Sequence, residues 1–141
     1  MSNKWGDYYS VLVSWLNKNN YKVIEGCREE DRIDFEDKTI YINSQYKPEN
    51  KLYTLLHESG HYSLNKYRDG FLKSHPVYPS GVSDHRKKRS KSYKVCLIAE
   101  EMEAWKRGIK IAKRFDFVIN EEKYFKEMVK SVWSYVKWAS R

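Results

Sequence analysis

The stretch Leu52-Tyr53-Thr54-Leu55-Leu56-His57-Glu58-Ser59-Gly60-His61 joins an apolar run to the pattern HExxH. Because residues four apart share one face of an α-helix, His57 and His61 can point at one metal ion. Glu58 lies one residue further round the helix and can reach a water molecule beside that ion. Two imidazoles that hold a metal, with a carboxylate that takes a proton from water, form the core of a zinc peptidase.

The surroundings of the motif favour this interpretation over chance. A bare HExxH occurs by accident in roughly one of a hundred sequences of this composition. Here Pro48 predicts the start of a helix that runs to about Tyr67, with a buried stripe formed by Leu52, Leu55 and Leu56. The two histidines lie near that stripe and need partners, which a metal would supply. Two surface histidines that flank a solvated glutamate are the alternative.

Composition predicts one folded domain over residues 1–141, with no segment that spans a membrane. A chain of 141 residues can bury one modest core, and 16% aromatic residues are typical of a folded protein. The start of the chain lacks the apolar core of a signal peptide. Cys27 and Cys96 lack metal-type spacing, so we expect reduced thiols in a cytoplasmic protein, with one disulfide as the alternative.

Hydrophobic periodicity predicts an α+β fold around the metal helix. An amphipathic helix is expected from Trp5 to about Asn19, followed by strands at 21–24, 32–35 and 39–43. The last two strands would form a hairpin, and Glu25-Gly26 would break the first. A second long helix is expected at 93–115.

Two further segments complete the expected fold. Turn signals predict a long basic loop at about 68–92, which in a compact domain is usually functional or mobile. A C-terminal helix at about 120–140 begins at the N-cap Asn120. Its apolar residues at helical spacing are Phe125, Met128, Val129, Val132, Val136 and Ala139.

The helix at 93–115 offers three candidates for the third zinc ligand: Glu100, Glu101 and Glu103. Tyr67 occupies the position where a metzincin would have a histidine, which excludes that class. Glu101 falls in the centre of the apolar face, Glu100 on its border and Glu103 near the opposite side. A buried carboxylate is costly unless a cation or metal pairs with it, so we predict Glu101 as the ligand. A buried Glu–Arg or Glu–Lys pair is the alternative.

Two segments resemble the ImmA/IrrE family of small HExxH metallopeptidases. Thr39–Asn43 followed by 53–62 resembles the strand and active-site helix of that family, and Glu101-Met102-Glu103-Ala104 resembles its E-x-E-A signature. The resemblance covers roughly residues 21–110. It implies a minimal gluzincin-like fold, with a small antiparallel sheet packed on the HExxH helix and an edge strand at 39–43 that pairs with an extended peptide. It further implies zinc bound by His57, His61 and Glu101, with Glu58 as base.

The chain departs from the family pattern just after this signature. Trp105 follows the alanine, where an acidic or amide residue is usual. The group that supports a metal-binding imidazole therefore stays unassigned.

The predicted activity is hydrolysis of a peptide bond in a protein or peptide substrate, with one specific regulator as a candidate. Zinc would lower the pKa of water, and Glu58 would accept the proton and pass it to the leaving amine. A donor to the oxyanion is also needed. The sequence offers several candidates without choosing among them: Tyr62, His75, Tyr78, His85 and Tyr93.

The run Arg86-Lys87-Lys88-Arg89 is the densest cluster of charge in a chain of net charge +8. It is a solvated loop or a patch for nucleic acid or an acidic partner. This leaves two alternative functions. One is a nucleic-acid or protein-binding module with a non-catalytic zinc site. The other is an SprT-like, DNA-associated protease with His75 or His85 as third ligand.

Overall fold

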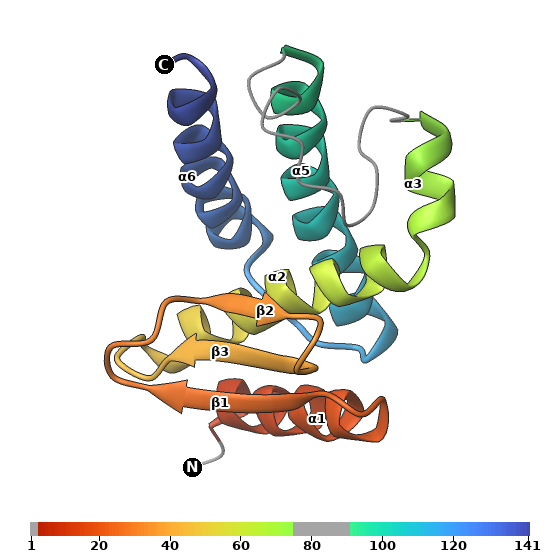
Figure 1. The fold of residues 1–141 in the computed structure, drawn as a ribbon. Helices are drawn as coiled ribbons and strands as arrows, with labels where there is room; N and C mark the ends of the chain where they lie inside the picture. Colours follow the sequence, from red (N-terminus) through yellow and green to blue (C-terminus); the bar gives the residue numbers. More distant parts are fainter. Residues whose placement is uncertain (1–2, 75–90) are drawn as a thin grey trace.

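A computed structural model describes residues 3–74 and 91–141 as a mixed α+β structure (Figure 1). Helix α2 lies between the sheet and α5, and α5 and α6 lie side by side. Helix α1 contacts β1 and α2. The elements are α1 (Lys4–Lys18), β1 (Lys22–Gly26), β2 (Arg32–Asp34), β3 (Thr39–Asn43), α2 (Pro48–Lys66), α3 (Arg68–Ser74), α5 (Lys91–Arg114) and α6 (Glu121–Ala139).

Local signals in the sequence explain where the helices begin and end. The Asn3 side chain accepts a hydrogen bond from the Gly6 amide at the start of α1, and Asn120 does the same for Lys123 at the start of α6. Pro48 occupies the first turn of α2. Asn20, with φ of 70°, turns the chain from α1 into β1. These boundaries agree with the sequence predictions within two residues.

The sheet has the order β1-β3-β2 and is mixed. β2 pairs antiparallel with β3, as the predicted hairpin requires, but β1 pairs parallel with β3. The expected antiparallel sheet is therefore wrong for β1, and β1 continues through Glu25 and Gly26. Thr39–Asn43 is also not an edge strand. Its Ile40 and Ile42 are fully buried, so the most apolar strand takes the central position, where both neighbours protect it.

The predicted loop at about 68–92 is wrong over its first seven residues, and residues 75–90 lie outside the described part of the chain. Residues 68–74 form α3, with Gly70 inside the helix rather than in a turn. Phe71 is buried, and Arg68 Nη2 lies 2.9 Å from Glu100 Oε1 on α5. The burial of Phe71 and this long-range ion pair stabilise a helix that turn propensity alone disfavours. At the other end, α5 already begins at Lys91.

Helix α6 buries a narrower face than its apolar spacing suggests. Met128 and Val132 pack against the core, whereas Phe125 and Val129 are exposed. The best buried residue of α6 is Tyr124, whose hydroxyl donates to the Trp105 carbonyl oxygen at 2.6 Å. Among the helices of residues 3–74 and 91–141, none is long and apolar enough to cross a membrane.

Candidate metal centre

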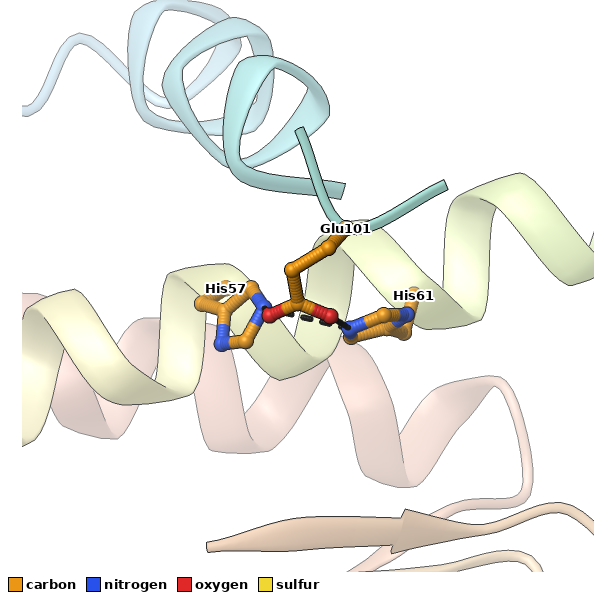
Figure 2. A group of neighbouring side chains, drawn as sticks. All are labelled: His57, His61 and Glu101. Atoms are coloured by element: carbon orange, nitrogen blue, oxygen red, sulfur yellow. Dashed lines mark hydrogen bonds and ion pairs between the residues drawn. The ribbon is translucent and has the colours of Figure 1, made fainter. Parts of the chain in front are cut away.

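His57 and His61 occupy successive turns on one face of α2 and point the same way (Figure 2). Their Nε2 atoms lie 3.1 Å apart. Both side chains are largely buried, as the proximity of the two histidines to the apolar stripe predicted. The helix therefore presents two imidazole nitrogens to a single point.

Glu101 reaches the same point from α5, and its carboxylate lies between the two imidazoles (Figure 2). Glu101 Oε1 is 2.6 Å from His57 Nε2, and Oε2 is 3.1 Å from His61 Nε2. The side chain is only 4% exposed. One ligand atom from each residue lies within 4.8 Å of the others. Two imidazole nitrogens and one carboxylate oxygen are a donor set typical of zinc with an open fourth position, so these residues fit the ion.

Two glycines allow the helices to approach closely enough for this convergence. A Cβ atom on Gly60 of α2 would collide with the carbonyl oxygen of Ala104 on α5. A Cβ atom on Gly108 of α5 would meet the Leu56 carbonyl oxygen of α2 at 2.7 Å. Each helix thus places a glycine against a backbone carbonyl group of the other helix. The glycine in His57-Glu58-Ser59-Gly60-His61 therefore has a packing role.

Neighbouring side chains hold the cluster in place. The Trp105 ring stacks on the His57 imidazole, with ring centroids 4.1 Å apart and an interplanar angle of 9°. Ser131 Oγ on α6 donates a hydrogen bond of 2.9 Å to Glu101 Oε1. Trp105 therefore supports the imidazole by stacking, and Ser131 orients the carboxylate. Such surrounding groups fix ligand geometry and tune affinity for the metal.

The carboxyl groups of this cluster have displaced pKa values. Burial raises the pKa of Glu58, and the nearby histidines only partly oppose that shift. Burial also favours neutral Glu101, but its hydrogen bonds to His57 and His61 and their charges hold its pKa well below the usual range. A buried carboxyl with a raised pKa accepts a proton more readily than a solvated one, which suits Glu58 to the role of base.

A cleft of about 360 Å³ opens onto this cluster. One wall is formed by β2 and its flanks, and the facing walls by α5 and α6. An adjoining cleft of about 330 Å³ shares Asp31, His57 and Ser131 with it. The residues that line the first cleft are Asp31, Arg32, Ile33, Phe35, His57, Glu58, His61, Leu97, Glu100, Glu101, Ser131 and Tyr135.

Of the other candidates, Glu100 lines the cleft and pairs with Arg68, whereas Glu103 and Tyr62 lie outside the cleft. Glu103 pairs with Arg107 one turn along α5, at 3.2 Å, and its side chain is 32% exposed, so the face expected to be solvated is partly buried. The Tyr62 hydroxyl donates to Asn19 Oδ1 at 3.1 Å, and its ring packs against Trp15. Its position beside α1 excludes it as an oxyanion donor. Tyr93 does not line the cleft. Candidates outside the described residues are His75, Tyr78, His85 and the run 86–89.

The contributions of α3 and α6 were missed by sequence reasoning. The pair of Arg68 and Glu100 lies beside the cluster, and both side chains are mostly buried. Ser131 and Tyr135 lie one turn apart on α6 and both line the cleft. Their spacing places them on one helix face, but nothing in the sequence indicates which face meets Glu101.

No protein-family model, curated protein or solved structure matches the chain.

Proposed function

We propose that this protein is a zinc-dependent peptidase. The observation that carries the proposal is the meeting of Glu101 from α5 with His57 and His61 from α2 at the floor of a cleft. These three residues would hold the ion. Zinc, when bound, would make a nearby water more acidic and polarise a substrate carbonyl.

Glu58 would move the proton. It neighbours His57 on α2, lines the same cleft and is 4% exposed. Its carboxylate would accept a proton from the attacking water and later donate it to the leaving amine nitrogen. The raised pKa that burial gives this group supports both transfers.

The cleft would hold a polypeptide beside β2. This strand ends the sheet order, and Arg32 and Ile33 line the cleft. An extended substrate would hydrogen-bond to this edge, in place of the 39–43 edge that the family resemblance implied. Such backbone hydrogen bonds would place one peptide carbonyl over the cluster, whichever side chains the substrate carries.

Glu58→Gln tests the proposal directly. The variant should retain zinc, because it keeps all three ligands, and should cleave a proteome-derived peptide library roughly 100- to 10,000-fold more slowly than the wild type. Mass spectrometry of cleaved termini measures activity, and plasma emission measures zinc. His57→Ala is the control that should lose the metal. Hydrolysis at the wild-type rate in Glu58→Gln would remove Glu58 from the base role.

A further inference from the structure

Tyr135 of α6 lies in the wall of the cleft that holds the ligand cluster. It lines this cleft together with Glu58, His57 and Glu101. Ser131, one turn earlier on the same face, donates a hydrogen bond of 2.9 Å to Glu101. This contact anchors α6 to the cluster and places the next turn of the helix beside it.

A tyrosine hydroxyl has an ordinary pKa of about 10, so that of Tyr135 carries its proton at neutral pH. This hydroxyl forms a hydrogen bond with Glu101. The side chain is half-buried, so its ring is held by packing while one side faces the cleft. A neutral phenol in this position is a hydrogen-bond donor and not a base.

Other tyrosine hydroxyls near α2 have hydrogen-bond partners outside the ligand cluster, whereas that of Tyr135 bonds to Glu101 within it. Those of Tyr46 and Tyr53 donate to Asp31 and Glu49, at 2.7 and 2.6 Å. Tyr62 and Tyr124 donate to Asn19 and to the Trp105 carbonyl. Within residues 3–74 and 91–141, Tyr135 is the tyrosine that shares the cleft with Glu58.

We propose that Tyr135 is a catalytic residue that donates a hydrogen bond to the oxyanion formed on the substrate carbonyl. The inference rests on the proposed peptidase function. As the water oxygen adds to the carbonyl carbon, the π electron pair moves to the carbonyl oxygen, and Glu58 takes the proton of the water. Tyr135 keeps its own proton throughout. When the carbonyl reforms, the C–N bond breaks and Glu58 gives its proton to the amine nitrogen.

The two roles belong to residues of different helices. Glu58 on α2 accepts and donates the proton, and Tyr135 on α6 stabilises the negative charge that forms on the carbonyl oxygen once water has added. A donor aimed at developing charge accelerates the reaction without tightening substrate binding. Tyr135→Phe should therefore lower kcat about 100-fold and change KM little.

A binding measurement tests Tyr135 without requiring catalysis. The protein is loaded with Co²⁺, and acetohydroxamate, whose oxygens mimic the charged carbonyl at the metal, is titrated while visible absorption is followed. Tyr135→Phe should weaken acetohydroxamate binding about tenfold. Its Tm should match the wild type, and its Co²⁺ affinity should fall by less than its acetohydroxamate affinity, because the variant also loses the hydrogen bond to Glu101. Tyr62→Phe is the matched control, because its hydroxyl faces Asn19, and it should bind acetohydroxamate as the wild type does.

The outcomes separate this inference from the function on which it rests. Wild-type acetohydroxamate affinity in Tyr135→Phe would overturn the role of Tyr135, even if peptides are cleaved. A loss of Co²⁺ affinity equal to the loss of acetohydroxamate affinity would also overturn it, since Tyr135 would then merely support Glu101. A wild-type protein that binds no Co²⁺ or Zn²⁺ would instead overturn the peptidase proposal.

Discussion

The Ser131 hydroxyl on α6 helps to orient the Glu101 carboxylate, which joins the two helices of the cluster. Ser131 Oγ donates to Glu101 Oε1, while Oε2 of the same carboxylate lies 3.1 Å from His61 Nε2. Without this donor the carboxylate would rotate more freely about its last torsion. Groups of this kind contribute to metal affinity because they lower the entropy cost of ordering a ligand.

Ser131→Ala should weaken zinc binding about tenfold and leave the fold intact, because it removes one hydrogen bond and adds no bulk. Competition with a chromophoric chelator measures the affinity. Ser134→Ala is a matched control on the same helix, since its exposed hydroxyl donates only to the Ser131 carbonyl oxygen. Equal zinc affinity in the two variants would show that Glu101 is oriented without Ser131.

At the scale of elements, the contact of α2 with α5 determines whether the cluster exists. Helix α2 carries both histidines and α5 carries Glu101, so the distance between the helix axes sets the distance between ligands. Gly60 and Gly108 allow the backbones to touch. Tyr124 of α6 closes the same contact from the side, because its hydroxyl binds the Trp105 carbonyl oxygen.

Gly60→Ala should push α2 and α5 apart, because the new methyl group meets the Ala104 carbonyl oxygen. We expect a loss of about 1–3 kcal/mol in the free energy of unfolding, together with weaker zinc binding. Urea unfolding and chelator competition measure the two effects.

Gly70→Ala is the control for this substitution. Gly70 lies in α3, and a Cβ atom there has no neighbour within 4 Å. Alanine should raise helix propensity and leave stability equal or slightly higher. A Gly60→Ala variant as stable as Gly70→Ala would contradict the role given to the close helix contact.

At the scale of the whole molecule, aromatic rings connect the N-terminal helix to the cluster. Trp5 of α1 contacts Tyr53 of α2, which contacts Tyr124 of α6. Tyr124 contacts Trp105 of α5, which stacks on His57. A series of ring contacts therefore crosses the core from one side to the site. Six tyrosines and three tryptophans belong to this core or pack against it.

The buried tyrosines predict alkaline unfolding. Burial raises the pKa of Tyr53 and Tyr124 above the ordinary 10.0. A tyrosine whose pKa is higher in the folded than in the unfolded protein stabilises the folded state below pH 10. This stabilisation is lost as the pH rises through the pKa of the folded state. The Tm should therefore be steady from pH 8 to about 10 and fall steeply above it.

Thermal melts across this range test the prediction, and absorbance at 295 nm reports tyrosine ionisation. The exposed tyrosines should ionise first. The later part of the rise in absorbance should coincide with the loss of helical circular dichroism, because the buried phenols ionise only when the core opens. Complete ionisation of the tyrosines at pH 11 in a folded protein would contradict the burial described above.

Local information in the sequence determined most elements and the triple of His57, His61 and Glu101. Helical periodicity, capping residues and the cost of an unpaired buried charge all depend on near neighbours or on one helix face, so they can be read along the chain. The meeting of the three side chains is confirmed, whereas their role as zinc ligands stays a prediction.

Only the tertiary structure decided the order of the strands, the helix at 68–74 and the part of α6 that faces the site. Each depends on which surfaces of distant segments meet. The parallel pairing of β1 with β3, the ion pair of Arg68 with Glu100 and the approach of Ser131 and Tyr135 to Glu101 are long-range contacts. The spacing of residues along the sequence shows which of them share one face of a helix or strand. It does not specify which other element that face contacts.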